Sequence, residues 1–189
     1  MESLNKMTVV VKDNGFGVKN IIIDEPKTYN SLSFKTLKML IDTFKRLERD
    51  NKTRVIILSG NGKGFSAGHN LKEVKNLKVR SKYLKLFNLC SKLMLQIVEG
   101  KKPVIAKVHG AAFAAGCQLV ASCDLAYSTN DAIFSTPGVN IGLFCSTPMV
   151  AVSRKVSRKR MMKMLLTGEP IKADYAKEIG LINDHFSKK

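Results

Sequence analysis

One pattern occurs three times in succession along this chain: an apolar run rich in β-branched residues, then a short loop, then a segment of helical character. The apolar runs are residues 18–23, 55–58 and 104–108. After the first two, apolar residues recur at helical spacing over 37–47 and 83–97, and a short helix is expected over 118–122, leading into a strand at 125–128. Alternating strands and helices predict an α/β fold with a largely parallel, buried sheet.

The length of the chain suits one hydrophobic core. Its 189 residues are 44% hydrophobic, so we interpret residues 1–189 as a single domain with a core over about 8–185. The cysteines lie in apolar surroundings, without the paired spacing or nearby histidines that zinc sites use. They are Cys90, Cys117, Cys123 and Cys145. This pattern predicts buried thiols in a reducing compartment.

The charge is strongly basic. The formal net charge is +17, from 32 Lys and Arg against 15 Asp and Glu, which favours a polyanionic partner. Coenzyme A with its phosphates, RNA and an acidic membrane surface all fit. Lysines that only solvate helix faces explain the same composition, so charge alone does not choose a partner.

No membrane span or leader is expected. The longest run of small apolar residues, Ala111 to Cys123, is interrupted by Gln118 and is shorter than the ~20 residues that cross a bilayer. The N-terminal stretch contains Glu2 and Asp13, and it has no apolar core and no arginine, so it does not resemble a signal or transit peptide. A presequence already removed would leave no trace.

Two loops rich in glycine and alanine follow predicted strands. The first is Lys-Gly-Phe-Ser-Ala-Gly-His-Asn-Leu at 63–71, and the second is Gly-Ala-Ala-Phe-Ala-Ala-Gly-Cys-Gln at 110–118. In parallel sheets, ligands bind beyond the carboxyl ends of strands. Small residues let a ligand approach the backbone, and two amides directed at one carbonyl oxygen make an oxyanion hole. Either loop alone is typical of close packing; together they indicate a ligand site.

Further short motifs accompany the two loops. They are Asp24-Glu25-Pro26-Lys27 with Asn30, Lys102-Pro103-Val104-Ile105-Ala106, Cys123-Asp124, and Thr167-Gly168-Glu169 with Gly180-Leu181-Ile182. With the loops, they resemble the signatures of the crotonase, or enoyl-CoA hydratase/isomerase, family. The resemblance covers about residues 8–185.

The resemblance implies a crotonase-like α/β fold, a spiral of ββα units with a C-terminal helical trimerisation region. It also implies an acyl-CoA thioester as ligand, with no cofactor besides the coenzyme A of the substrate, and a lyase or isomerase role in fatty acid metabolism. A homotrimer or hexamer, in the mitochondrion or otherwise in the cytoplasm, is expected. Since this sequence stops at Lys189, where relatives continue, we expect the trimerisation region to be truncated.

The same resemblance implies where the site lies. Backbone N–H groups of His69 and Ala115 would form the oxyanion hole. Adenine would lie near the backbone of Ser66 and Ala67, and Lys27 would lie near the phosphates. The substrate contacts would run over His69, Asn70, Leu71 and Lys72.

Both catalytic glutamates of the family's hydratases are missing. The residue three beyond the second oxyanion amide is Gln118, and Pro137 is followed by Gly138 where the second glutamate is expected. Hydration needs a base for water and an acid for the α-carbon, and neither residue supplies one. We therefore expect weak or altered chemistry, although the Gln118 amide could still position a water molecule.

Other side chains could replace the acid and base that the two glutamates supply in the family. The His69 ring titrates near neutrality and could act as acid or base, or it could point to solvent while only its amide is used. His109 is interpreted as a packed strand residue, Asp124 as a buried turn or cap aspartate, and Glu73 as an exposed helix carboxylate. Cys145 is interpreted as an inert buried thiol.

Two alternatives to an enzyme remain open. A non-catalytic acyl-CoA-binding or scaffold protein is consistent with Gln118 and Gly138. Nucleic-acid binding is consistent with basic residues on helix faces, although few aromatic residues are interleaved for base stacking. The two basic groups are Lys35, Lys38, Lys45, Arg46 and Arg49, and Arg154, Lys155, Arg158, Lys159 and Arg160.

Overall fold

A computed structural model describes residues 7–187, so the argument from Glu2 concerns a residue outside the described part. The larger sheet has six strands in the order β1 (Val9–Asp13), β2 (Val18–Ile23), β3 (Val55–Gly60), β5 (Val104–Val108), β7 (Leu125–Thr129) and β10 (Asp184–Phe186). Within this sheet only β1 and β2 pair antiparallel, and the other neighbours are parallel. The predicted, largely parallel sheet is therefore confirmed.

A second sheet of four short strands lies beside the first. Its order is β4 (Gly64–Ser66), β6 (Ala111–Phe113), β8 (Ile133–Ser135) and β9 (Ile171–Lys172). The interpretation of residues 110–118 as a loop after a strand was wrong in part, because β6 occupies three of them. Alanine has little preference for strands, and the pairing of β6 with β4 and β8 supplies what the local sequence does not.

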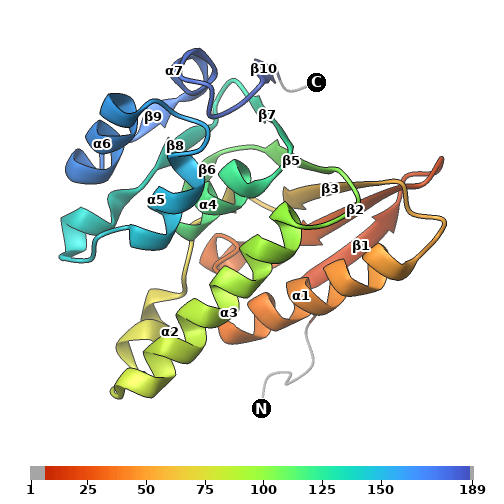
Figure 1. The fold of residues 1–189 in the computed structure, drawn as a ribbon, viewed down its shortest axis with the longest axis horizontal. Coiled ribbons are helices and arrows are strands. Elements are labelled where there is room, and N and C mark those ends of the chain that lie inside the picture. Colours follow the sequence, from red (N-terminus) through yellow and green to blue (C-terminus); the bar gives the residue numbers. More distant parts are fainter. Residues whose placement is uncertain (1–6, 188–189) are drawn as a thin grey trace.

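Helices cover the sheets. They are α1 (Phe34–Arg49), α2 (Leu71–Lys75), α3 (Arg80–Val98), α4 (Ala115–Ser122), α5 (Ser146–Val152), α6 (Arg158–Thr167) and α7 (Ala173–Glu178). Figure 1 shows α1 and α3 lying side by side over one face of the larger sheet, with α6 and α7 at the end remote from β1. Helix α4 begins three residues before the predicted Gln118.

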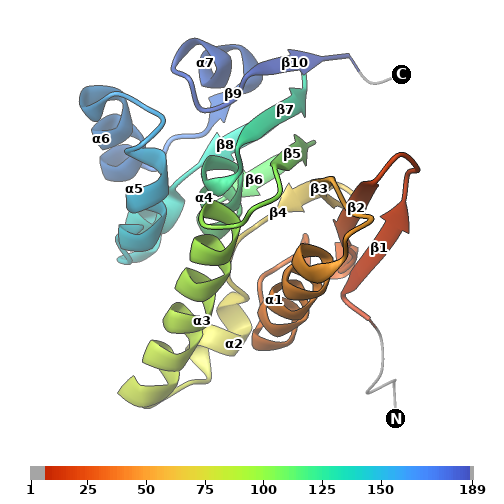
Figure 2. The same cartoon turned by 45° about the vertical axis from the view of Figure 1, so that its right-hand side comes forward.

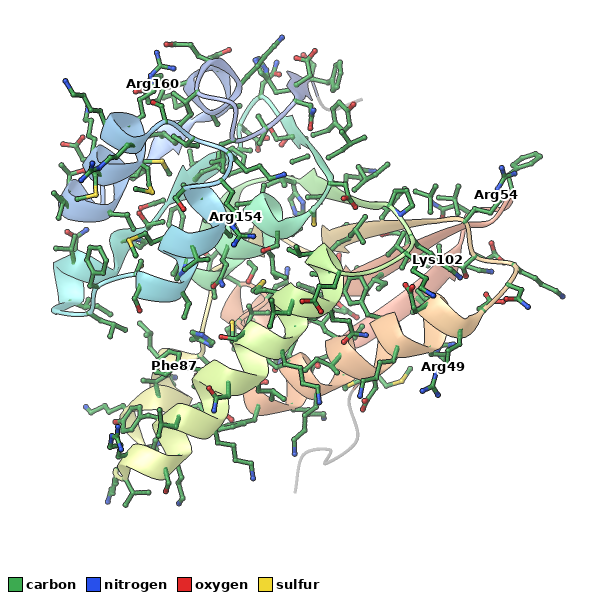
Figure 3. The ribbon with its side chains drawn as sticks, in the orientation of Figure 1. Arg49, Arg54, Phe87, Lys102, Arg154 and Arg160 are labelled. Atoms are coloured by element: carbon green, nitrogen blue, oxygen red, sulfur yellow. The ribbon has the colours of Figure 1, made fainter. Side chains whose placement is uncertain are left out.

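The amphipathic pattern of α1 explains its packing. The stripe Leu37, Leu40, Ile41, Phe44 and Leu47 is buried as expected, and Ser33 caps the helix by accepting a hydrogen bond from the Thr36 amide at 3.1 Å. Truncating one such buried leucine to alanine costs about 2–5 kcal/mol. At the other end of α1, the Lys102 Nζ donates to the Leu47 carbonyl at 2.6 Å (Figure 3), so this motif lysine is structural.

One hydrophobic core cluster extends from Val9 to Ile182 through both sheets. Figure 2 shows α4 near the middle of the molecule, between α3 and α5. All eight residues of α4 are buried, so its first turn is held by packing on every side. Among the described residues, none of the helices combines the length and the apolar character that crossing a bilayer requires.

Candidate active site

The first glycine loop is anchored to the chain that precedes α1. Ser66, at the end of β4, is 1% exposed, and its hydroxyl donates to the Asn30 carbonyl at 2.9 Å and accepts from the Gly68 amide at 3.2 Å. The Gly68 carbonyl accepts from the Leu32 amide at 2.8 Å. These bonds fix the direction of the backbone on both sides of Gly68.

The Asn30 side chain forms three further hydrogen bonds that stabilise this arrangement. It is fully buried, and its Nδ2 donates to the carbonyls of Asn61 at 2.7 Å and Gly64 at 2.8 Å, while its Oδ1 accepts from the Glu25 amide at 2.8 Å. One side chain thus joins the loop that follows β2 to the two segments around β4. This explains physically why the sequence motif contains an asparagine.

The second loop makes a sharp turn from β6 into α4. Ala114 has φ +49°, a conformation that residues other than glycine rarely adopt, and its amide donates to the Ser135 carbonyl at 2.9 Å. Such a conformation costs on the order of 1 kcal/mol or more and persists only where the surroundings impose it. The sequence gives no signal for it, because alanine does not favour positive φ.

The two loops interlock through glycine. A Cβ at Gly68, which has φ +85°, would lie 2.8 Å from the Phe113 carbonyl oxygen and 3.0 Å from the Ala115 nitrogen. A Cβ at Gly116 would lie 2.2 Å from the Ser66 carbonyl oxygen. Both glycines are therefore required by close approach of the two backbones, and the predicted proximity of the two loops is confirmed.

The amides of His69 and Ala115 stand at this junction. Within the described residues, neither of them donates a backbone hydrogen bond. Ala115 is the first residue of α4, where N–H groups have no partner inside the helix and the helix dipole is positive. Two free N–H groups on adjacent backbones form an arrangement that can receive one electron-rich oxygen.

The His69 ring does not point to solvent, so that alternative was wrong. Its Nδ1 lies 3.4 Å from the Leu32 carbonyl oxygen, and the ring meets Phe87 of α3 edge-on with centroids 5.3 Å apart. Its Nε2 is enclosed and has no hydrogen-bond partner among the described residues. Burial lowers the pKa of His69 below its usual value, although the Leu32 carbonyl opposes this. The ring is therefore neutral at neutral pH.

Gln118 lies one helical turn after Ala115. It is 4% exposed, and its enclosed Oε1 accepts no hydrogen bond from the described residues. A carboxamide neither gains nor loses a proton in the physiological pH range. It can therefore donate or accept a hydrogen bond, but it cannot act as a base.

Gly138 is packed too tightly for any side chain. It lies in the 3₁₀ helix η2 (Pro137–Ile141), and a Cβ there would be 2.0 Å from the Leu143 carbonyl oxygen and 2.8 Å from the Cys145 sulfur. The Gly138 amide donates to the Cys145 sulfur at 3.3 Å, and burial raises the pKa of this thiol. The prediction that Cys145 is a buried, unreactive thiol agrees with this environment.

The predicted binding residues are mostly exposed. Lys27 is exposed on the 3₁₀ helix η1 (Pro26–Thr28), Ala67 is exposed within the first loop, and Leu71 and Lys72 are exposed at the start of α2. The Asn70 Oδ1 accepts from the Glu73 amide at 3.1 Å and caps α2. The side chains of Ser66 and Asn70 are thus committed to the protein's own backbone.

Three further interpretations from the sequence are corrected or refined. Glu73 is not simply exposed, because its Oε2 accepts from the Phe34 amide at 2.9 Å and caps α1. His109 lies beyond the end of β5 rather than in a strand, with Nε2 2.8 Å from the Gly62 carbonyl oxygen. Asp124 is structural, since its Oδ2 accepts from the Val104 amide at 2.8 Å, but its side chain is exposed rather than buried.

The basic groups lie mostly at the surface. Those of α1 are exposed, and so are Arg154, Lys155, Arg158 and Lys159. Arg160 is engaged elsewhere, because its Nη2 pairs with the Glu178 carboxylate at 2.9 Å and its guanidinium lies 6.0 Å from the Tyr175 ring centre. Nucleic-acid binding by these faces stays a prediction.

Sequence comparison gives one family. The profile described as Enoyl-CoA hydratase/isomerase matches residues 13–189. The chain is similar to "Enoyl-CoA hydratase domain-containing protein 3, mitochondrial" of Homo sapiens, 48% identical over 167 residues, which is 88% of this chain and 55% of the relative. It is also similar to "Enoyl-CoA hydratase, mitochondrial" of Pongo abelii, 35% identical over 91% of this chain and 58% of the relative. The chain thus spans less than two thirds of these relatives.

Structural comparison agrees with this result. A crystal structure of an enoyl-CoA hydratase from Mycobacterium smegmatis matches with a TM-score of 0.94 at 46% identity, covering 96% of this chain and 71% of that one. The human enoyl-CoA hydratase domain-containing protein 3 matches with a TM-score of 0.93 at 44% identity, covering 96% and 72%. The arrangement of two sheets and covering helices described above is therefore the fold of these proteins.

Proposed function

Because the chain belongs to the enoyl-CoA hydratase/isomerase family, we propose that it binds an acyl-CoA thioester and holds the thioester oxygen between the amides of His69 and Ala115. The oxygen gains negative charge as an enolate forms, and two preorganised N–H groups stabilise that charge. The proton transfers that follow are slower than in relatives with two catalytic glutamates.

One observation carries this proposal. The backbones of the two loops meet at Gly68 and Gly116, within distances that exclude a Cβ, and they leave two amides without backbone partners. Unpaired buried amides are costly unless they serve a ligand or contact water. Fixing the pair this rigidly is the preorganisation that an oxyanion hole needs, because nothing has to reorient when charge develops.

The slow proton transfer that we propose follows from Gln118 and Gly138, which stand where the family's hydratases have glutamates. A well-placed general acid or base contributes about 10² to 10⁴ in rate, and an oxyanion donor contributes about 10² to 10³. Gln118 cannot take a proton from water, and Gly138 has no side chain that could deliver one to the α-carbon. The site therefore retains stabilisation of the enolate and lacks efficient proton transfer.

The His69 ring is assigned no acid–base role. A base must reach the proton that it abstracts, and the Nε2 of this ring is enclosed next to Phe87. Packing of the ring instead holds the loop so that the His69 amide keeps its direction. We therefore assign the backbone of His69, and not its imidazole, to the reaction.

The coenzyme A part of the ligand is assigned to the exposed surface beside the first loop. The ammonium groups of Lys27 and Lys72 suit phosphates, and Ala67 and Leu71 offer exposed backbone and apolar surface. Ser66 and Asn70 contribute by shaping the loop, since their side chains bond to backbone. Coenzyme A enters with the substrate, so no separate cofactor is assigned.

Location and assembly are proposed from the relatives. Two relatives described above carry "mitochondrial" in their names, so we assign this protein to the mitochondrion and to acyl-CoA metabolism. A homotrimer or hexamer is assigned by family resemblance. Sedimentation of the protein as a monomer at micromolar concentration would contradict that assignment.

Calorimetric titration with crotonyl-CoA and with free coenzyme A tests the function. We expect crotonyl-CoA to bind more tightly than coenzyme A, and the enoyl absorbance of the bound sample to decline far more slowly than with a glutamate-bearing relative at equal concentration. Binding without any turnover would make this a non-catalytic acyl-CoA-binding protein. Absence of binding by both compounds would refute the proposal.

A further inference from the structure

The turn between β1 and β2, residues 14–17, carries an aromatic side chain into solvent. We call this turn the hairpin tip. Its Phe16 is 98% exposed, the largest exposed fraction among the large hydrophobic residues of the described part. Figure 1 and Figure 2 both show the hairpin tip projecting at the end of the larger sheet. A partly exposed leucine is ordinary on a protein surface, but this ring leaves almost its whole apolar area in water.

The backbone of the hairpin tip has a conformation that phenylalanine rarely adopts. Phe16 has φ +52°, and it lies between Gly15 at +80° and Gly17 at +79°. A bulky residue in this left-handed region is strained. The turn is nevertheless fixed, because the Val18 amide donates to the Gly15 carbonyl at 2.9 Å and the Arg54 amide donates to the Gly17 carbonyl at 2.7 Å. Strain and exposure at the same residue indicate that the ring acts outside the fold.

Basic side chains accompany the ring. Lys12, Lys52 and Arg54 are exposed, and none of them has a carboxylate partner within residues 7–187. The stem of Arg54 lies against the hairpin tip, since a Cβ at Gly17 would be 2.7 Å from the Arg54 Cγ. Figure 3 shows Arg54 at this end of the molecule. The hairpin tip therefore presents one aromatic ring beside unpaired cations.

The carboxylates of the same region are already bonded. Asp13 pairs with Lys19, and Asp50 is bonded to the loop between α1 and β3. Residues 12–19 and 49–54 together contain five basic side chains and two acidic ones. The net charge around the hairpin tip is therefore positive, which favours an anionic surface as its partner.

An exposed aromatic ring beside cations suits the interface of an anionic lipid bilayer. Apolar side chains enter the boundary between headgroups and acyl chains, while lysine and arginine are attracted to anionic headgroups. Single-stranded nucleic acid is instead held in a basic groove with stacking platforms, whereas this ring projects from a turn. We propose that the hairpin tip attaches the protein reversibly to an anionic lipid surface, with Phe16 inserted and Lys12, Lys52 and Arg54 at the headgroups.

The hairpin tip lies far from the proposed thioester site. It leads into the amino end of β2, whereas the two glycine loops follow the carboxyl ends of β3 and β5, and these three strands are parallel. Attachment through the hairpin tip leaves the glycine loops at the end of the sheet remote from the lipid. Lipid binding and acyl-CoA binding can therefore be tested separately.

Phe16→Trp gives a direct test, because the chain contains no tryptophan. Vesicles of phosphatidylcholine with about a third of phosphatidylserine should shift the indole emission to shorter wavelength, and acyl chains carrying bromine should quench it. Leu166→Trp is the matched control, since Leu166 is 56% exposed on α6, at the end remote from β1, and its indole should show neither change. Emission of Phe16→Trp that does not respond to these vesicles would overturn the proposal.

Sedimentation with the same vesicles tests the native ring and its cations. Phe16→Asn should lower the affinity about tenfold, because asparagine accepts the left-handed conformation and keeps the turn while removing the ring. Lys52→Gln/Arg54→Gln should lower the affinity by a similar factor, and Arg158→Gln/Lys159→Gln, an exposed pair on α6, should not. Equal decreases in the two double variants, or full affinity in Phe16→Asn, would mean adsorption by overall charge and would overturn the proposal. Calorimetry of Phe16→Asn with crotonyl-CoA should match the wild type.

Discussion

The loops around Gly68 and Gly116 and the turn around Gly138 both depend on glycine, but for different reasons. At the loops, the missing side chains allow two backbones to meet and leave two amides free for a ligand. At the turn, the missing side chain allows the Leu143 carbonyl and the Cys145 sulfur to occupy the space that a side chain would need. In the proposed site, the two backbone amides are present, whereas the position proposed for the second glutamate has no room for a side chain.

A glutamate side chain does not fit at position 138 without a change in the surrounding backbone. The segment that leads from η2 into α5 fills the space that a side chain at this position would need. At Gln118, by contrast, a side chain with the length of a glutamate is present, and its enclosed Oε1 has no hydrogen-bond partner among the described residues. The four predictions that follow test this difference, from the largest expected effect to the smallest.

Substitution of Gly138 by alanine should cause the largest change. Its Cβ would lie 2.0 Å from the Leu143 carbonyl oxygen, so we expect a loss of about 3 kcal/mol or more in the free energy of unfolding. The control is Gly142→Ala, since Gly142 has φ +72° and open space around it. That variant should lose only about 1 kcal/mol. Equal losses in urea titrations would contradict the packing described at Gly138.

Gly68→Ala should weaken binding of crotonyl-CoA at least tenfold, about 1.4 kcal/mol, because its Cβ would press on the Ala115 nitrogen and the Phe113 carbonyl. Gly15→Ala is the matched control. Gly15 has φ +80° and no neighbour within 4 Å, so it carries the same backbone strain without the contact. Calorimetry should show unchanged affinity for this control, and an equal decrease in both variants would argue against the amide pair.

Gln118→Glu should raise the hydration of crotonyl-CoA by about tenfold, below the 10² to 10⁴ of a fully placed base, because the second carboxylate stays absent. Burial should also favour the neutral carboxyl, so the gain should increase with pH. Gln96→Glu is the control, because Gln96 lies on α3 and its Oε1 is likewise enclosed without a partner among the described residues. A rate that does not change with Gln118→Glu would place this position outside the reaction.

The smallest effect concerns pH. Burial lowers the pKa of His69, so the folded state binds fewer protons than the unfolded state below the usual histidine pKa of about 6.5. Stability should therefore fall as the pH decreases below that value. The lowered pKa values of Asp13, Asp50 and Asp184 act only at more acidic pH.

Urea titrations above and below this pH measure how the free energy of unfolding changes with pH. This change should be smaller for His69→Gln than for the wild type. His109→Gln replaces a half-exposed ring that is bonded to the Gly62 carbonyl. Its free energy of unfolding should change with pH as much as that of the wild type. An equal change of stability with pH in His69→Gln and the wild type would contradict a buried, neutral ring.

Much of the fold was predictable from periodicity, because the strands at 18–23, 55–58 and 104–108 and the helix stripes are long enough to carry a pattern. The short strands β4, β6, β8 and β9 were not, since two or three residues cannot show a period of two. Their pairing is decided by contacts between segments far apart in sequence, such as Ala112 with Phe134.

The candidate site was predictable in its backbone and less so in its side chains. Glycines at 68 and 116 mark a close approach that sequence spacing can indicate. Burial of the His69 ring, capping of α1 by Glu73 and closure around Gly138 depend on which distant segments pack there, and no local pattern encodes them.

The central claim is that the amide pair polarises a thioester carbonyl without an efficient acid–base pair beside it. Infrared difference spectroscopy of bound crotonyl-CoA, with the carbonyl carbon isotopically labelled, measures that polarisation directly. The account predicts a carbonyl stretch at lower frequency than in solution, retained in Gln118→Glu and lost in Gly68→Ala, while hydration by the wild type stays slow. A bound carbonyl that absorbs at its solution frequency would contradict it.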